Sequence, residues 1–365
     1  MRFARRLSFL IATLLLSGLA MAQQIEVYHA YWMGDVWRQY DLRKFHRILF
    51  FNLVPDNDGH LADTHGWPQR WTDLHQQAAA AGTPVVPVVT VMGGDLFHAI
   101  FGTPSARSRL LQECVDLARA GDGLHLDLEL FEPVPPGDAD SFDAFLTALR
   151  AALDEPPRKP LSAFVPAGDL YSAAQLANFD EIVAQAYDVH WIDSAQAGPV
   201  SLLEGDSPAA LAPAAAKLVA AGVPRERIFF SSPLYGYEWP VVSDQPGAAT
   251  RGKARIVTYA PVSADQLPDL RVNALSRVVQ FGLRREPQSG APWYALSEAD
   301  GWWQGWFDDA GSLGRRLEFV RNGKFGGVAF FVLGYDGGAL VETARAAFKA
   351  RSADAAGARP PAGRQ

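Results

Sequence analysis

Residues 123–129 read Gly-Leu-His-Leu-Asp-Leu-Glu, and no other stretch of the chain is as informative about the fold. In a β-strand successive side chains point to opposite faces, so the leucines share one face and His125, Asp127 and Glu129 share the other. A strand buried on both faces is normally almost continuously apolar. Two carboxyl groups and an imidazole therefore indicate either an antiparallel strand with one face in water, or buried groups with partners or a chemical task.

The first 22 residues form a segment that we expect to be absent from the mature protein. Three arginines precede a mostly apolar run over residues 7–19, and a small-x-small triplet at 20–22 provides a cleavage site. This pattern is that of a secretory signal peptide, and its apolar run is too short to span a membrane. We therefore expect an exported protein, periplasmic or extracellular, without a membrane span.

Composition narrows the class of partner. The formal net charge is −7, and removal of the three signal-segment arginines, with no acids, takes it to −10. Such an acidic protein is a poor partner for nucleic acids or anionic membranes. The single cysteine, Cys114, excludes an intramolecular disulfide, so apolar packing must hold the fold together. The 10 Trp and 10 Tyr are typical of a carbohydrate-active protein, because these side chains suit binding surfaces.

The chain alternates strand-like and helix-like segments almost from end to end. Eight β-type runs are expected at residues 25–31, 47–54, 85–91, 123–130, 161–166, 182–187, 228–234 and 327–333. Helical patterns separate most of them, with weak patterns in the first and fifth connections. This rhythm predicts an α/β fold, a (β/α)8 TIM barrel. A doubly wound open sheet is the alternative, but no Gly-x-Gly-x-x-Gly follows the first strand.

One segment breaks this rhythm between the seventh and eighth strands. Residues 237–307 contain strand-like pieces and turns but no further strand–helix unit. We interpret this segment as a small α+β insertion domain after strand 7, at approximately residues 240–305. The expected organisation is a signal peptide over 1–22, a barrel over 23–351 interrupted by the insertion, and a disordered tail over 352–365, rich in Ala, Gly, Pro and Arg.

Barrel closure would turn the polar face of residues 123–129 inward, because alternate residues of each barrel strand point to the interior. Glu129 would then lie nearest the mouth, at the C-terminal ends of the strands, where barrel active sites are found. Two carboxyl groups this close raise the pKa of one of them, so Glu129 can stay protonated near neutral pH, as a general acid must. This arrangement favours buried functional groups over a wet strand.

Five segments resemble motifs of the family 18 glycoside hydrolases, the chitinases and their relatives. Residues 122–129 are similar to the strand-four signature Asp-x-x-Asp-x-Asp-x-Glu, and residues 184–188, Ala-Gln-Ala-Tyr-Asp, to the strand-six motif Met-x-Tyr-Asp. Residues 232–239 resemble the strand-seven Pro-x-Tyr-Gly segment that precedes the family's insertion domain. Residues 305–312 and 326–328 resemble the return to the barrel and the start of strand eight. The chain therefore resembles a divergent, bacterial-type exported member of this family.

The resemblance implies roles for four residues. Glu129 would protonate the glycosidic oxygen, Asp127 would orient the 2-acetamido group, and Tyr187 would hydrogen-bond its carbonyl oxygen. Asp188 would contact the sugar beside the cleavage point. No enzyme nucleophile is needed, because in this family the N-acetyl oxygen attacks the anomeric carbon. The resemblance thus implies a retaining hydrolase of β-1,4-linked N-acetylglucosamine glycans such as chitin or chito-oligosaccharides. We expect neither a cofactor nor a metal ion.

Three positions depart from the family's pattern. His125 stands where an acid is usual; a neutral imidazole could donate to Asp127, and a charged one would hold Asp127 as a carboxylate. Val91 stands where the strand-three Ser-x-Gly-Gly pattern has a hydroxyl. Phe331 replaces the strand-eight tryptophan that floors the cleavage subsite, and its ring offers a sugar less area. We expect activity to survive with an altered pH profile.

Aromatic residues at or just after strand ends are the remaining candidates for sugar contacts. The expected substrate-binding residues are His125, Asp188, Tyr31, Trp32, Trp191, Tyr235, Trp239 and Phe331, with packing as the alternative for each aromatic ring. The tryptophans at 302, 303 and 306 fall in the insertion, which needs a core of its own.

Two other functions stay open. A non-catalytic glycan-binding protein could use the same barrel, although the presence of Glu129, Asp127 and Tyr187 argues against it. An endo-N-acetylglucosaminidase acting on peptidoglycan or N-glycans would share the chemistry and differ in substrate. In each case the expected partner is an N-acetylglucosamine-containing polysaccharide or oligosaccharide, and we expect the protein to be a monomer.

Overall fold

The computed structural model describes residues 23–130, 133–168, 170–262 and 270–357. The expected signal peptide, residues 1–22, and the last part of the expected tail, residues 358–365, lie outside the described residues. No helix among the described residues is both long enough and apolar enough to cross a bilayer.

Eight parallel strands close into a barrel, as the alternation predicted. They are β1 (Gln24–Ala30), β2 (Arg47–Pro55), β4 (Val85–Met92), β5 (Leu124–Glu129), β6 (Leu161–Val165), β7 (Glu181–Ala184), β8 (Ile228–Pro233) and β14 (Gly327–Phe331). Closure is made by β1, which pairs with β2 on one side and with β14 on the other. A short antiparallel strand, β3 (Leu61–Asp63), extends β2 beyond the ring. The predicted TIM barrel is confirmed, and the open sheet is excluded.

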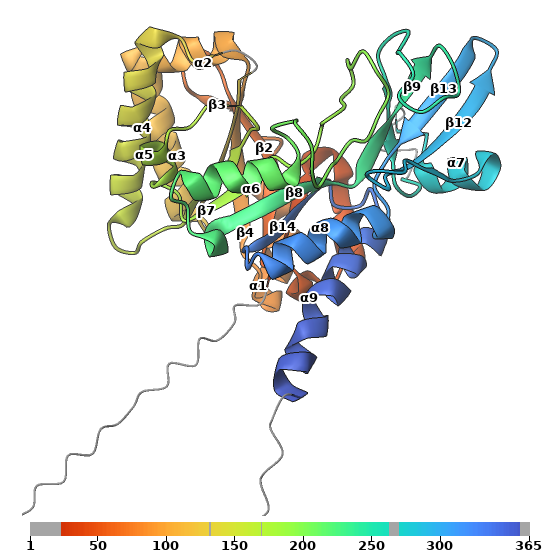
Figure 1. Cartoon of the computed structure of the whole chain (residues 1–365). Helices are drawn as coiled ribbons and strands as arrows, with labels where there is room; N and C mark the ends of the chain where they lie inside the picture. The colour runs from red at the N-terminus through yellow and green to blue at the C-terminus, as the bar shows by residue number, and fades with distance from the viewer. Residues whose placement is uncertain (1–22, 131–132, 169, 263–269, 358–365) are drawn as a thin grey trace, which may run out of the picture.

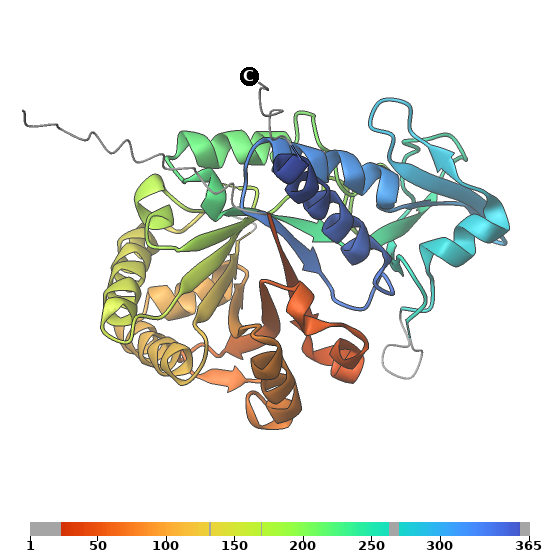
Figure 2. The ribbon, with the colours of Figure 1, turned by 90° about the horizontal axis from the view of Figure 1, so that it is seen from below.

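Helices cover the outside of the ring, as Figure 2 shows. They are α1 (Thr72–Ala81), α2 (Gly94–Phe101), α3 (Pro104–Ala120), α4 (Pro136–Asp154), α5 (Ala173–Leu176), α6 (Leu211–Ala220), α8 (Ala310–Asn322) and α9 (Ala339–Gly357). The two connections with weak helical patterns are irregular. The first contains the 3-10 segments η1 (Tyr31–Gln39) and η2 (Leu42–Lys44), and the fifth contains only the four-residue α5.

The segment expected to be a disordered tail begins inside a helix. Helix α9 continues to Gly357, which corrects the expected boundary at residue 352. The reason lies in the alanines, which lower the complexity of the segment but are also the strongest helix formers. In Figure 1 the end of α9 projects away from the barrel.

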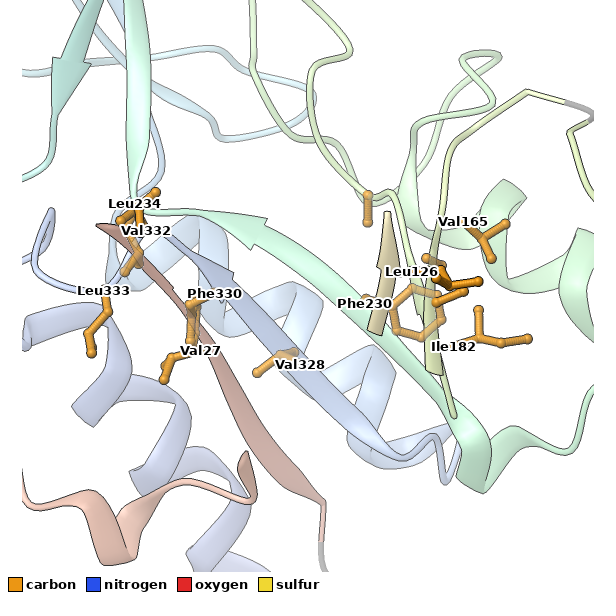
Figure 3. Packing of buried hydrophobic residues seen from close by; sticks show 14 of the residues in the cluster. Val27, Leu126, Val165, Ile182, Phe230, Leu234, Val328, Phe330, Val332 and Leu333 are labelled. Carbon is orange, nitrogen blue, oxygen red and sulfur yellow. The ribbon is translucent and has the colours of Figure 1, made fainter. Parts of the chain in front are cut away.

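Two apolar cores use opposite faces of the same strands. The outer core packs strands against helices and includes the leucines of β5; Figure 3 shows part of it, with Val27, Leu126 and Phe330. The inner core fills the barrel with side chains from the alternate strand positions. They are Tyr28, Leu49, Val86, Val88, Phe164, Val183, Phe229 and Ala329. His125 is 0% and Asp127 3% exposed, so the polar face of β5 lies in the barrel interior and not in water.

The insertion after β8 is an antiparallel sheet with one helix. Its strands are β9 (Tyr235–Val241), β10 (Arg255–Thr258), β11 (Arg284–Arg285), β12 (Pro292–Glu298) and β13 (Gly301–Trp306), in the order β10-β9-β13-β12-β11. Helix α7 (Ala274–Phe281) packs on one face, and the unit stands beside the barrel in Figure 1. A single residue, Leu234, separates β8 from β9. The sheet therefore starts at Tyr235, slightly before the expected residue 240.

A buried ion pair fastens the return from the insertion to the barrel. Asp308 follows β13, and its Oδ2 accepts a hydrogen bond from Arg316 of α8 at 2.6 Å. The same guanidinium donates to Ser232 Oγ on β8 at 2.7 Å and to the Ala186 carbonyl at 3.4 Å. Both charged side chains are buried. Three segments that meet at the barrel mouth therefore depend on one compensated pair of charges.

Replacing Asp308 by Asn should lower the free energy of unfolding by about 3–5 kcal/mol, because Arg316 would stay buried without its counter-charge. Urea denaturation at constant pH measures the change. Glu155→Gln is the matched control: Glu155 is 74% exposed in its pair with Arg119, and its loss should cost no more than about 1 kcal/mol. Equal costs for the two variants would contradict the role assigned to Asp308.

Candidate active site

Asp127 and Glu129 stand on the inward face of β5, at the C-terminal mouth of the barrel. Asp127 is buried, and Glu129, at the end of the strand, is half-buried. Burial raises the pKa of Asp127 well above its usual value, and the charge of Glu129 raises it further. Burial also raises the pKa of Glu129. Two acids so placed favour sharing a proton, and a carboxyl that keeps its proton is what a general acid requires.

Among the side chains that the structure describes, Thr90 on the neighbouring strand β4 donates a hydrogen bond to Asp127. Thr90 Oγ1 donates to Asp127 Oδ2 at 3.2 Å, and the two residues are partners in the β4–β5 register. The motif comparison indicated that a strand-three hydroxyl is lost at Val91. The structure supplies a hydroxyl one residue earlier, since Val91 packs into the outer core while Thr90 faces the interior. Period-two alternation along β4 could have found this residue.

His125 lies on β5 deeper in the barrel than Asp127 and Glu129. Its Nε2 lies 3.0 Å from the Tyr28 hydroxyl and its Nδ1 lies 2.8 Å from Ser162 Oγ. Among the described side chains these are its hydrogen-bond partners, so the ring does not donate to Asp127, which was one of the two possibilities that the sequence left open. Burial lowers the pKa of His125 well below its usual value, and the charge of Arg47 lowers it further, which disfavours the imidazolium alternative. His125 was expected to bind substrate. It has no exposed surface, so a substrate cannot touch it, and this expectation is corrected.

Tyr187 and Asp188 follow β7 at the same mouth. Ser231 of β8 fixes the start of this segment, donating to the Ala184 carbonyl at 2.9 Å and accepting from the Ala186 amide at 3.1 Å. Tyr187 is half-buried against the inner core. Burial and the charge of Asp188 raise the pKa of the Tyr187 hydroxyl, so this hydroxyl remains a hydrogen-bond donor.

Two tyrosines of the insertion sheet bind Asp188. The hydroxyls of Tyr235 and Tyr237 each donate to Asp188 Oδ1 at 3.2 Å. Burial raises the pKa of Asp188 to about 7, although both hydrogen bonds act in the opposite direction. Asp188 also has a φ of +61°, in the left-handed region that most residues avoid. Sequence reasoning did not select Tyr237; its place two residues after Tyr235 on one strand was the available signal.

Phe331 lies at the mouth, as expected, in a cluster of aromatic rings. Its ring contacts those of Phe51, Tyr28 and Tyr235 at centroid distances of 5.2, 5.6 and 6.4 Å. The ring is half-buried, so part of it remains available to a ligand at the barrel mouth.

Tyr31 and Trp32 follow β1 at the rim. The Tyr31 ring stacks on His65 at a centroid distance of 3.3 Å. Trp32 Nε1 donates to the Tyr335 hydroxyl at 3.0 Å, and its ring meets Phe51 edge-on at 5.8 Å. Both side chains are half-buried, so the structure brings them to the same end of the barrel as Phe331 while holding them in place.

Trp191 and Trp239 differ in their surroundings. Trp191 is 46% exposed, as a sugar-stacking residue would be, whereas Trp239 is 0% exposed. Trp239 Nε1 donates to the Trp191 carbonyl at 3.2 Å, which ties the Trp191 loop to the insertion sheet. The expected sugar contact of Trp239 is therefore corrected: it is a core residue, because it sits on the face of β9 that packs into the outer core.

Within the described ranges, one group of acids and histidine is close enough to hold a metal ion. It comprises Glu26, His46 and Glu181, whose ligand atoms lie within 4.8 Å of one another at the N-terminal end of the barrel, away from Glu129. Arg47 already occupies this position, with guanidinium nitrogens 2.8 Å from both glutamates. Burial raises the pKa of Glu26 to about 7. We interpret the group as an ion-pair cluster.

Sequence comparison identifies the class of protein that this fold and site define. The profile described as Glycosyl hydrolases family 18 matches residues 25–336, so the chain belongs to that family. The family prediction is confirmed, and the family is one of glycosidases.

Individual relatives are distant. The Bacillus subtilis protein named "Putative sporulation-specific glycosylase YdhD" is 26% identical over 257 residues, which are 66% of this chain and 54% of that protein. The chain thus spans about half the length of that relative. A family 18 chitinase from Cycas revoluta, solved with allosamidin, superposes with a TM-score of 0.72 at 18% identity, covering 89% of this chain and 99% of the other. A Chromobacterium violaceum chitinase gives 0.68 at 20%, with the same coverage. These structures support the fold.

Replacing Tyr237 by Phe should raise the pKa of Asp188 above its value of about 7. The variant removes a donor to the ionised carboxylate, and a hydrogen bond to a charged group is worth ~1.5 kcal/mol or more, or about one pKa unit. Asp188 would therefore ionise only at higher pH. Carbon-13 NMR titration of the aspartate carboxyls measures the shift.

Tyr40→Phe is the matched control, because the Tyr40 hydroxyl donates to Asp336 and not to Asp188. It should leave the Asp188 titration in place. An unchanged or lowered Asp188 midpoint in Tyr237→Phe would show that the hydroxyl does not stabilise the carboxylate.

Proposed function

We propose that this protein is a retaining glycoside hydrolase that cleaves β-1,4 bonds next to N-acetylglucosamine by a substrate-assisted mechanism. One observation carries the proposal: two carboxyl groups with raised pKa values, Asp127 and Glu129, share the inward face of β5 at the barrel mouth. The hydroxyl of Tyr187 stands at the same mouth. A polymer of N-acetylglucosamine, in chitin, chito-oligosaccharides or a related glycan, offers the groups that these three residues would bind.

Glu129 is the general acid in this proposal. It is half-buried at the end of β5, so its side chain reaches the solvent side of the mouth, where a glycosidic oxygen can approach. Its raised pKa keeps the carboxyl protonated until the leaving group needs the proton. After transfer, the Glu129 carboxylate accepts a proton from the water that completes hydrolysis, because the two steps are the reverse of each other in proton flow.

Asp127 and Tyr187 act on the acetamido group. The acetamido oxygen attacks the anomeric carbon, so positive charge develops on the acetamido nitrogen and carbon, and the family is known for this exception to the two-carboxylate scheme. Asp127, held by Thr90, supplies negative charge beside that group. The Tyr187 hydroxyl, which keeps its proton because of its raised pKa, donates a hydrogen bond to the acetamido oxygen. The Phe331 ring offers the sugar an apolar face at the floor.

The leading alternatives differ in chemistry and in substrate. A non-catalytic glycan-binding protein would need neither raised pKa, and both acids are present with raised values. The Cycas neighbours include complexes with (GlcNAc)3 and (GlcNAc)4, and the Bacillus relative is named a sporulation-specific glycosylase. These names support N-acetylglucosamine glycans as the class and leave chitin, peptidoglycan and N-glycans as candidates. The N-terminal segment supports export to such a substrate.

Replacing Glu129 by Gln should lower the rate of chito-oligosaccharide hydrolysis by at least about 100-fold, the typical contribution of a general acid. The affinity for the oligosaccharide should stay within a few-fold, because the amide keeps the shape of the side chain. Single-turnover kinetics and calorimetry measure the two effects.

Glu204→Gln, in an exposed loop, is the control and should keep full activity. Unchanged turnover in Glu129→Gln would reject Glu129 as the acid. Tight binding of oligosaccharide by the unaltered protein with no cleavage of any glycan would support the non-catalytic alternative.

Every new reducing end should be an N-acetylated sugar, whichever glycan is cleaved, because the acetamido oxygen is the nucleophile. Mass spectrometry of products from chito-oligosaccharides, peptidoglycan and N-glycans identifies the substrate, and partly deacetylated chitosan tests the rule. Products that end in glucosamine would contradict substrate assistance while leaving Glu129 as a possible acid.

A further inference from the structure

We propose that His125 is a positioning residue that takes no part in proton exchange, because hydroxyl groups from two other strands occupy both nitrogens of its ring. Asp127 and Glu129 are thereby left as the two acids on the inward face of β5. The inference rests on the proposed function for its kinetic consequence, but the state of the His125 ring can be measured without any activity.

The geometry around His125 leaves its ring no free polar atom. Ser162 is the register partner of His125 on β6, and its Oγ lies 2.8 Å from Nδ1. Tyr28 reaches Nε2 at 3.0 Å from β1, and the two rings also meet edge-on at 5.6 Å between centroids. All three side chains are buried. The neighbouring strand β6 and the more distant strand β1 therefore hold the imidazole from its two nitrogens.

The contacts of the Ser162 hydroxyl favour the imidazole proton on Nδ1. Ser162 Oγ also lies 3.4 Å from the Leu124 carbonyl oxygen, which can only accept. With its own proton directed to that carbonyl, Ser162 Oγ accepts from Nδ1–H of His125. Nε2 then accepts from the Tyr28 hydroxyl. A neutral ring with both positions filled has no proton to give to Asp127 and no lone pair to receive one.

The charges around His125 also favour the neutral ring. Arg47 of β2 is the cation whose charge acts on the imidazole, and it is paired with Glu26 of β1 and Glu181 of β7. Asp127 and Glu129 lie on the same strand as His125, and burial together with the charge of these acids raises the pKa of the Tyr28, Tyr171 and Tyr187 hydroxyls. No carboxylate among the described residues hydrogen-bonds the ring, so an imidazolium would be buried without a counter-ion.

A neutral imidazole at position 125 changes the number of acids that exchange protons at the site. An acid at position 125 would form a column of three carboxyl groups with Asp127 and Glu129. The imidazole reduces the column to two acids, with Thr90 as the side-chain partner of Asp127. Glu129 then loses its proton with Asp127 beside it on β5 and Asp188 at the same mouth, and an acid at position 125 would add a further negative charge. The position of the alkaline limb of the pH–rate profile depends on this difference.

Two substitutions test the kinetic consequence. His125→Asn keeps a neutral polar side chain, and both limbs of the kcat/KM profile should stay within about 0.3 pH units while the rate falls by less than about 10-fold. His125→Asp restores a third acid, and the alkaline limb should move to higher pH by about one unit. A moved limb in His125→Asn, or an unmoved alkaline limb in a folded His125→Asp, would overturn the proposal.

Nitrogen-15 NMR of histidine-labelled protein tests the ring directly, with His125→Asn used to assign the signal. The expected result is one neutral, Nδ1-protonated ring with constant shifts between pH 5 and 8. Titration of the His125 signal in that range, or protonation at Nε2, would overturn the proposal. Absence of hydrolysis in the unaltered protein would contradict the proposed function alone, because this spectrum reads the imidazole and not the reaction.

Discussion

Closure of the barrel through β1 places the polar face of β5 in an interior that excludes water. The same six residues on the edge of an open sheet would carry two ordinary carboxylates with ordinary pKa values. Because β1 pairs with both β2 and β14, those carboxyl groups face other strands and not solvent. Loss of solvation is the largest cause of the raised pKa of both Asp127 and Glu129. The chemistry proposed for the mouth therefore depends on the ring being complete.

Regular alternation made much of the fold and part of the site predictable. Leucines at every second position of β5 define its outer face, so the inward direction of Asp127 and Glu129 follows once a barrel is assumed. The motifs around Tyr187 and Tyr235 placed both residues at the strand ends, where the structure has them. In these cases the information is local: a period of two, or a short motif with fixed spacing.

The failures share a different cause, which is contact between segments far apart in the chain. His125 binds Tyr28, 97 positions away, and its use of both nitrogens decides that Asp127 receives nothing from it. The sequence placed Trp239 just after a strand end, where a cleft residue would lie, yet it lies within β9 and packs into the outer core. Thr90 was missed because the Ser-x-Gly-Gly pattern directed attention to its outward neighbour Val91. A sequence motif gives the position of a side chain along the strand but not its partner across the fold.

The direct passage from β8 into β9 has a mechanical meaning. Leu234 is the one residue between the two strands, and Gly236 allows β9 to approach the Trp306 backbone where a Cβ would collide. The insertion sheet is thus attached to the barrel by a one-residue connection, and the strand that follows it, β9, carries Tyr235 and Tyr237. Because both hydroxyls donate to Asp188, which follows β7, the placement of the insertion sheet on the barrel sets the hydrogen bonding of one carboxyl at the mouth. A change in the packing of the insertion sheet would therefore change the pKa of a residue that belongs to the barrel.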